Sequence, residues 1–381
     1  MKQKICSVIF STGLPEESFL SLGAGQPRFL LPFAGRFTFL DFFLSAARRM
    51  GSELELVVTA RHAELAHSYM ERAWGENGWD ILPFLGEGED ALLNKNMIQA
   101  FKSILKPWVL LCRADTPLYA DLAPLLSRIK RSPEVVIGLV GGQTAPALLV
   151  EKGALLDQLG DQLRRKIKAS DALSAAHRHF LKHPRAQQAE VPGFLPRITT
   201  LDQYIDANLE VLARLDEYNR FFVSTPLHSG LHEKKPAVIE RGGAVFNSMI
   251  ADDAHVAGRV TGSILFPGAV VSAGAEVVDS VLLPGVVVGP GARLVRTLAG
   301  PGVALPQNIK YHIGQDCRLG KELYAPAQER GPFCKGYTYL AAGALLPRGI
   351  SIGANCCLGP GIDRNTFRRS KNISDGRRLG F

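Results

Sequence analysis

The loop after the first apolar segment is the first place in the chain where the residue types suggest chemistry. Residues 5–10 form an apolar run, and Gly13 lies just beyond it. A glycine after a strand is where main-chain amides can approach a phosphate group. Here Pro15 removes one amide donor, and Glu16 and Glu17 add negative charge that repels phosphate. The loop is therefore placed like a phosphate site but poorly composed for one.

The first half of the chain supplies the elements that would position such a loop. Short apolar runs alternate with helical patterns up to about residue 190, which predicts a mainly parallel, three-layer α/β sheet. Ligands of such sheets bind at the carboxyl ends of the strands, and Gly13 lies at one of these ends. Strands are expected at residues 5–10, 54–59, 108–112 and 135–140, and helices at 42–50, 63–72, 90–105, 118–130 and 154–166.

The last third of the chain is an internal repeat. Three segments, starting at Ser263, Ser280 and Thr297, align without gaps at a spacing of 17 residues. Turn residues that tolerate left-handed backbone fall six apart within each segment, with short Val, Ile and Leu runs between them. This pattern predicts the triangular coils of a left-handed parallel β-helix from about Ala244 onward. The predicted corners are Gly268, Gly274, Gly285, Gly291, Gly302 and Asn308, and then, after an irregular insertion of about residues 314–336, Gly343, Gly349, Asn355 and Gly361.

Two histidines in the repeat are candidates for acyl transfer. Hexapeptide helices often belong to acyltransferases in which a histidine is the general base. His255 and His312 are the histidines within this repeat. Neither has a carboxylate at an obvious orienting distance along the sequence, so a position at a corner or on the surface is the simpler interpretation. The β-helix alone names no reaction.

Composition limits the remaining possibilities. The chain has 381 residues and a formal net charge of +8, with basic clusters at residues 164–168 and 364–378. Such clusters suit solvated surface or a small anionic ligand. Nucleic acid is not expected, because interleaved aromatics and zinc or helix-turn-helix patterns are missing from the sequence. No apolar run is long enough to span a bilayer, and the six cysteines show no CxxC spacing. We expect a soluble cytoplasmic protein with free thiols and no membrane partner.

Three stretches of sequence are recognisable. Residues 31–45, LPFAGRFTFLDFFLS, resemble the PFGGRYRLIDFPLSN segment of bacterial ADP-glucose pyrophosphorylase, also called glucose-1-phosphate adenylyltransferase. Residues 200–212, TLDQYIDANLEVL, look like the helix that joins the two domains of that family. The stretches NSMI at 247–250 and SVLLPG at 280–285 look like its hexapeptide repeats. The resemblance implies a Rossmann-like nucleotidyltransferase domain over residues 1–192, a linker helix and connection over 193–243, and the β-helix with a basic tail over 244–381.

The resemblance also implies where a remnant nucleotide or phosphate site lies. Arg28 stands at the family's lysine position, Asp90 in its nucleotide-contacting segment, and Asp115 at its strand-end aspartate. Asp115 is either a turn residue that caps the strand end or a weak candidate for a retained metal contact. Arg197 stands at a second metal-side aspartate, and an arginine cannot bind Mg²⁺. Gly13, the remaining member, is what is left of the glycine-rich loop.

Three functions follow from this pattern. The first is a non-catalytic regulatory subunit of glycogen biosynthesis that assembles with a catalytic homologue, or with itself, as a tetramer and binds an anionic sugar-phosphate effector. The second is an active sugar-1-phosphate nucleotidylyltransferase with a rearranged loop. The third is a hexapeptide acyltransferase. The eroded loop favours the first, with no catalytic residue and no resident cofactor, whereas activity would require Mg²⁺.

Overall fold

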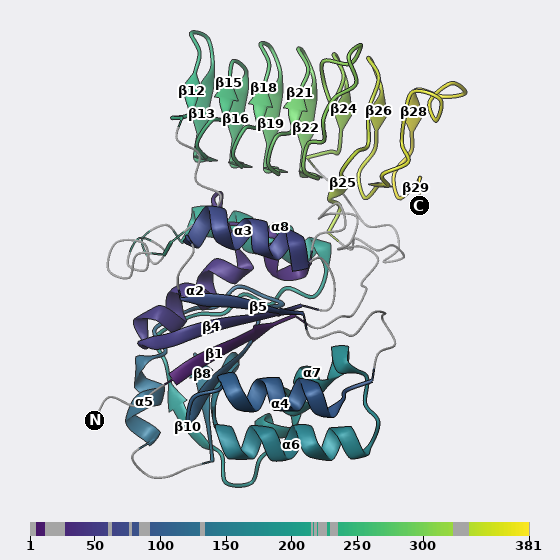
Figure 1. Cartoon of the computed structure of the whole chain (residues 1–381). Helices are drawn as coiled ribbons and strands as arrows, with labels where there is room; N and C mark the ends of the chain where they lie inside the picture. Colours follow the sequence, from purple (N-terminus) through teal and green to yellow (C-terminus); the bar gives the residue numbers. More distant parts are fainter. Residues whose placement is uncertain are drawn as a thin grey trace.

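The computed structural model describes residues 5–11, 27–59, 63–75, 78–83, 92–129, 134–214, 216, 219, 227–228, 235–322 and 335–380. The described chain forms two parts, an α/β domain and a β-helix that lies across one side of it (Figure 1).

The α/β domain is built on a seven-stranded sheet with the strand order β10-β8-β9-β6-β1-β4-β5. The sheet is mainly parallel, as expected, and β9 alone runs antiparallel to its neighbours β6 and β8. The cause is the Gly141–Gly142 pair, in which both residues have positive φ and close a tight hairpin between β8 and β9. The strands are β1 (Ile5–Phe10), β4 (Ser52–Thr59), β5 (Trp79–Pro83), β6 (Trp108–Arg113), β8 (Val135–Val140), β9 (Gln143–Glu151) and β10 (Gln187–Glu190).

Helices cover both faces of this sheet (Figure 1). The alternation along β1 separates the two cores: Ile5 and Ile9 pack on one side, and Val8 and Phe10 on the other. The first core contains α2 (Phe39–Arg49), α3 (Ala63–Trp74) and α5 (Ala123–Ile129). The second contains α4 (Lys95–Ile104), α6 (Lys152–Arg164) and α7 (Ala169–Leu181), of which α7 is not among the helices expected from the sequence.

The β-helix consists of three parallel sheets; each of the first four coils contributes one short strand to every sheet, and the later coils contribute strands to the second and third sheets. The first sheet holds β12 (Val238–Ile239), β15 (His255–Val256), β18 (Val270–Val271) and β21 (Val287–Val288). The second holds β13 (Ala244–Phe246), β16 (Arg259–Thr261), β19 (Glu276–Val278), β22 (Arg293–Val295), β24 (Arg318–Leu319), β26 (Ser351–Ile352) and β28 (Asn372–Ile373). The third holds β14 (Met249–Ile250), β17 (Ile264–Leu265), β20 (Val281–Leu282), β23 (Thr297–Ala299), β25 (Thr338–Leu340), β27 (Cys357–Leu358) and β29 (Arg378–Leu379). The β-helix therefore begins at β12, before the predicted start at about Ala244.

Most predicted corners of the β-helix are found as corners. Gly268, Gly274, Gly285 and Gly291 have φ between 67° and 73°, and Gly343, Gly349 and Asn355 are also left-handed. Gly361 lies in a turn like those of the other corners, closed by the Ile362 amide and the Gly359 carbonyl, but its φ is not positive. Gly302 and Asn308 are not among the residues with positive φ, so the predictions for these two are wrong.

The chain leaves the regular coil earlier than the 17-residue alignment indicates. After β23, residues 300–312 form no strand, and the chain returns at Ile313, which bridges Val288 and Leu346 in the first sheet. β24 then pairs with β22 and β26, although it lies within the predicted insertion at 314–336. The sequence does not reveal this excursion, because Gly302 and Asn308 stand six residues apart, like the corner residues of the preceding coils.

A row of buried hydroxyl groups fixes the register of successive coils. The Oγ of Ser263 accepts a hydrogen bond from the Ser280 amide at 3.0 Å, and the Oγ of Ser280 accepts one from the Thr297 amide at 3.0 Å. Each hydroxyl also donates to a main-chain carbonyl two residues earlier. All three side chains are fully buried, so each bond satisfies a polar group that water cannot reach.

The two parts meet in a core rich in aromatic side chains. The turn between β2 (Pro32–Phe33) and β3 (Phe37–Thr38) and helix α8 (Leu201–Ala213) pack against the third sheet of the β-helix. Asn208 is fully buried, and its Oδ1 accepts a hydrogen bond from the Ala34 amide at 3.0 Å. The hydroxyl of Tyr204 donates to the carbonyl of Pro32. The most recognisable stretch of the sequence thus builds the junction between the two parts.

The cysteines are buried where the structure describes them. Cys6, Cys112, Cys317, Cys356 and Cys357 are free thiols in the two parts of the molecule. Burial raises the pKa of Cys357 to about 12, so this thiol stays protonated. Among the described helices, none is long and apolar enough to cross a membrane.

Replacement of Asn208 tests the junction. Asn208→Leu keeps the volume but leaves the buried Ala34 amide without its acceptor, which should lower the free energy of unfolding by about 1–3 kcal/mol. The measurement is urea-induced unfolding. Glu210→Ala, on the same helix, breaks only a surface pair with Arg214 and should cost about 0.5 kcal/mol or less. Equal losses in the two variants would contradict this role of Asn208.

Candidate functional site

Three polar residues, Ser11, Arg113 and Asp115, lie together at the carboxyl ends of β1 and β6. The two strands are parallel neighbours, and Phe10 lies beside Arg113 in their register. Just beyond them, the Ser11 hydroxyl donates to Asp115 Oδ1 at 2.8 Å, and Arg113 Nε lies 3.3 Å from Asp115 Oδ2. Asp115 is only 7% exposed. Both of its carboxylate oxygens therefore face groups of this chain, a hydroxyl and a guanidinium.

Arg28 uses its guanidinium to connect separate segments of the main chain. Arg28 is the first residue of the 3₁₀ helix η1 (Arg28–Leu30), and its Nε donates to the carbonyl of Asp115 at 2.8 Å. Its Nη2 donates to the carbonyl of Ile198 at 2.5 Å. An arginine that donates from two nitrogens to two carbonyls holds these segments in fixed positions. In this geometry Nε and Nη2 of Arg28 are both engaged by main-chain carbonyls, and its role in binding an anion stays a prediction.

The donor set around Asp115 does not fit a magnesium ion. Mg²⁺ is held by carboxylates and other oxygen ligands, and it avoids neighbouring cations. Here Asp115 faces Arg113, while Arg197, at the second metal-side position of the resemblance, is exposed on the segment before α8. Within the described residues no group of three acidic, histidine or cysteine side chains is placed to hold a metal.

His177 is a buried titratable group beside this cluster that sequence reasoning missed. It lies on α7, 1% exposed, with its ring edge against Phe10 and its Nε2 3.3 Å from the carbonyl of Pro146. Its Nδ1 is buried without a hydrogen-bond partner. Burial, and then repulsion from Arg113, lowers the pKa of His177 to about 4. The ring is therefore neutral at physiological pH, and no motif in the sequence marks it.

A second buried carboxylate, Asp41, serves the fold. Its oxygens accept hydrogen bonds from the Thr38 amide, the Tyr69 hydroxyl and the Trp74 indole N–H at 2.6–3.0 Å. Burial raises the pKa of Asp41 to about 6 in spite of these bonds. Because Asp41 is fully buried at the start of α2, it closes the capping box of that helix and meets no solvent.

The remaining residues of the predicted site are dispersed or lie outside the described chain. Gly13 and Asp90 both fall outside the described residues. Thr200 caps α8 (Leu201–Ala213) by accepting a hydrogen bond from the Gln203 amide at 3.3 Å. Gln203 reaches back to the amide of Thr199, one residue before the position that a capping box requires.

The two histidines of the β-helix have different surroundings. His312 is 5% exposed, and its Nδ1 accepts the Val287 amide at 3.0 Å while its Nε2 lies against the main chain of Val303. Both ring nitrogens thus hold the excursion at 300–312 against the coil, which leaves none for catalysis. His255 lies on the exposed surface of β15, and its Nδ1 is 3.6 Å from Glu240. That carboxylate is not apparent from the spacing in the sequence.

The fold and the site define a class of protein, in which a Rossmann-like α/β domain precedes a left-handed hexapeptide β-helix. Residues 235–330 match the family model described as the GlmU-like C-terminal hexapeptide. Within this class, the predicted resemblance to glucose-1-phosphate adenylyltransferases is confirmed by several curated relatives that carry this name.

Three of these relatives give the extent of the similarity. The chain is 28% identical to the glucose-1-phosphate adenylyltransferase of Acetivibrio thermocellus over 201 residues, which are 52% of this chain and 45% of the relative. It is 36% identical to that of Thermotoga sp. strain RQ2 over 186 residues (48% and 42%). It is 35% identical to that of Thermotoga neapolitana over 181 residues (47% and 41%). The chain thus spans less than half the length of each of these relatives.

The pKa of His177 makes a testable contribution to stability. Above pH 6.5 the histidine is neutral in both states; as the pH falls towards 4, the unfolded chain binds a proton that the folded chain does not. The free energy of unfolding should therefore fall by on the order of 2–3 kcal/mol between pH 7 and pH 4.5 from this group alone.

His177→Gln should remove this component. The comparison is the difference in unfolding free energy between pH 7 and pH 4.5, from urea titrations of the wild type and the variant. Asp41 changes stability in the opposite direction, since its raised pKa makes ionisation costly as the pH rises from 3.8 towards about 6. Both proteins contain Asp41, so its effect cancels. An unchanged pH dependence in His177→Gln would show that the ring is not a neutral buried group.

Proposed function

We propose that this chain is a non-catalytic, regulatory relative of glucose-1-phosphate adenylyltransferase that assembles with a catalytic homologue and modulates the synthesis of a glycogen precursor. The chemistry of its relatives would require phosphate-binding amides, cations at the reacting phosphorus and carboxylates for Mg²⁺. In this proposal the chain has the two-part architecture of its relatives but lacks these phosphate-binding and metal-binding groups.

The observation that carries the proposal is the environment of Asp115. A carboxylate that binds a metal presents its oxygens to the ligand cavity, whereas Asp115 is hydrogen-bonded by Ser11 and faced by Arg113. Arg28, at the family's lysine position, is directed to main-chain carbonyls. These contacts support a structural use of residues that would otherwise hold substrate.

The first coil of the β-helix supports assembly. β12, β13 and β14 are each the first strand of their sheet and pair on one side only within the described chain. Ile239 and Phe246 on this coil are 54% and 57% exposed, and Val238 is 38% exposed. Exposed large apolar side chains beside unpaired strand edges favour contact with another subunit.

An active nucleotidylyltransferase is the second candidate, because the curated relatives carry that activity in their names and Asp115 lies at the strand end where a ligand would bind. The ion pair between Asp115 and Arg113 argues against catalytic activity, because this carboxylate already faces a cation of the chain. Acyl transfer is weaker still, since the ring of His312 is fully used by the main chain and His255 is on the outer surface.

An assay of pyrophosphate release separates the first two candidates. Purified protein supplied with ATP or another nucleoside triphosphate, Mg²⁺ and glucose 1-phosphate should release no pyrophosphate, because the groups that bind and polarise the triphosphate are missing or engaged. An intact homologue from the same genome serves as the positive control. Turnover of about 1 s⁻¹ or faster by this chain would be ordinary enzymatic activity and would refute the proposal.

Co-expression tests the assembly. Tagged chain should retain the catalytic homologue on purification and elute with it as one oligomer on size-exclusion chromatography. Phe246→Glu places a charge on the first coil and should abolish this co-elution, with little change in thermal unfolding because Phe246 is exposed. Leu65→Glu, a matched change at an exposed leucine of α3, should leave the complex intact. A strictly separate pair of proteins would count against the regulatory role.

A further inference from the structure

The second sheet of the β-helix carries two outward rows of side chains. Its strands align residue by residue, and the aligned residues Val277, Leu294, Leu319 and Ile352 are buried in the core of the β-helix. The first outward row is charged over the middle coils: Arg259, Glu276, Arg293 and Arg318, followed by Ser351 and Asn372. The second row runs Phe246, Thr261, Val278 and Val295, then has glycines on two coils, Gly320 after β24 and Gly353 after β26, before Ser374 after β28.

A groove forms where the second row has no side chains. It has a volume of about 770 Å³ and extends over β22, β24, β26 and β28. Neither glycine tolerates a side chain, since a Cβ at Gly320 would clash with the Val295 carbonyl and one at Gly353 with the Asp375 carboxylate. The groove is therefore a fixed consequence of the main-chain path.

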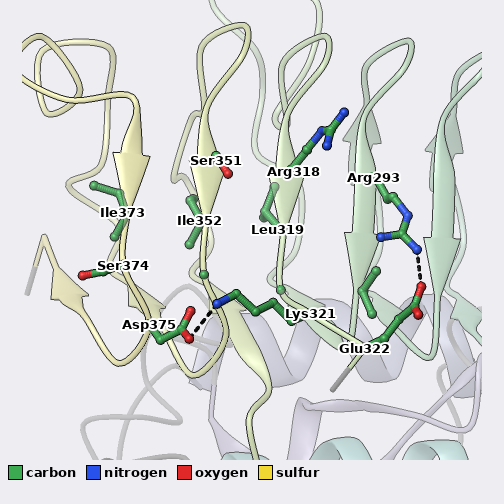
Figure 2. Close-up of a pocket in the computed structure, with 13 residues that line it drawn as sticks. Arg293, Arg318, Leu319, Lys321, Glu322, Ser351, Ile352, Ile373, Ser374 and Asp375 are labelled. Carbon is green, nitrogen blue, oxygen red and sulfur yellow. Dashed lines mark hydrogen bonds and ion pairs between the residues drawn. The ribbon is translucent and has the colours of Figure 1, made fainter. Parts of the chain in front are cut away.

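One of the three basic side chains that line the groove has no acidic partner among the described residues. Three basic and two acidic side chains border it. Lys321 Nζ contacts Asp375 Oδ2 at 2.7 Å, and Arg293 contacts Glu322 (Figure 2). Arg293 Nε also lies 2.7 Å from Glu276 Oε2, outside the lining. Both acidic groups of the lining are thus used by Lys321 and Arg293. Arg318 is exposed and, among the residues that the structure describes, has no ion-pair partner.

We propose that this groove binds a small hydroxylated organic anion, whose phosphate or carboxylate group pairs with Arg318. The planar guanidinium donates two parallel hydrogen bonds to either kind of oxyanion. The groove is larger than an inorganic ion requires, and the hydroxyl of Ser351, beside Arg318 on the next strand, is placed for the hydroxylated body of the ligand. The Lys321–Asp375 pair closes the opposite side (Figure 2).

The groove lies far from the cluster at Asp115, on a different sheet of the other part of the molecule. That the bound anion acts as an effector rests on the proposed regulatory function, whereas binding of the anion to the groove does not. Failure of ligand binding at Arg318 would leave the pyrophosphate assay untouched, and pyrophosphate release would not alter the binding result.

Isothermal titration calorimetry of the full-length chain tests the site. The probes are glucose 6-phosphate for a phosphate ester, gluconate for a carboxylate, and glucose as the uncharged control, at low ionic strength. At least one of the two anions should bind, and glucose should not. Arg318→Gln should weaken that binding about tenfold or more, as expected for loss of a charge-assisted pair, and Ser351→Ala should weaken it by a smaller factor.

Arg259→Gln is the matched control. Arg259 lies in the same outward row, three coils earlier and outside the groove, so its loss changes net charge equally without touching the site. Its variant should bind the probe like the wild type. Equal weakening in the Arg318 and Arg259 variants would mean that only general positive charge attracts the anion, and would overturn the proposal. So would a wild-type titration in which neither anion binds more tightly than glucose.

Discussion

The aromatic core between the two parts of the molecule is the constraint on which the rest depends. The β2–β3 turn, α8 and the third sheet of the β-helix share one apolar cluster that contains Phe33, Phe42, Tyr204 and Tyr339. Aromatic side chains bury large areas, and water cannot replace the hydrogen bonds of polar groups inside such a cluster. Loss of this core would expose an apolar face of the β-helix. It would also free Ile198, a buried member of the same cluster, whose carbonyl accepts a hydrogen bond from Arg28.

This dependence explains why the recognisable sequence and the chemistry are separate. Residues 31–45 carry the clearest likeness to the adenylyltransferases, and they form the junction. Gly35 has a φ of 77°, a left-handed backbone that favours glycine, and it lies against the Met249 side chain of the first coil. Residues that maintain the junction are under a packing constraint that persists whether or not the chain turns over substrate.

The architecture was predictable because its signals are periodic. Strand β1 reads as a short apolar run, and the corners at Gly268, Gly274, Gly285 and Gly291 follow from spacing alone. Departures from the expected pattern arose where a local feature overrides a period. Gly141 and Gly142 reverse the chain and make β9 antiparallel, and the excursion at 300–312 is masked by turn residues in the expected register.

The site was less accessible to sequence reasoning for a different reason. Arg28, Asp115 and Ile198 are brought together from three segments, and whether a guanidinium binds a ligand or a main-chain carbonyl depends on distances of an ångström. His177 has no sequence signal at all, because its low pKa comes from burial between α7 and β1. The partner that a side chain selects is a property of three-dimensional packing.

The hydroxyl row through Ser263, Ser280 and Thr297 has a geometric consequence. Because each bond joins equivalent positions of adjacent coils, neighbouring coils cannot slide past one another, and every feature of the helix is spaced in whole coils. Adjacent parallel strands lie about 4.8 Å apart, so the three intervals from β22 to β28 measure roughly 14 Å along the axis. Loops that leave at the corners can therefore change length freely, while the distances between outward side chains on different coils stay constant.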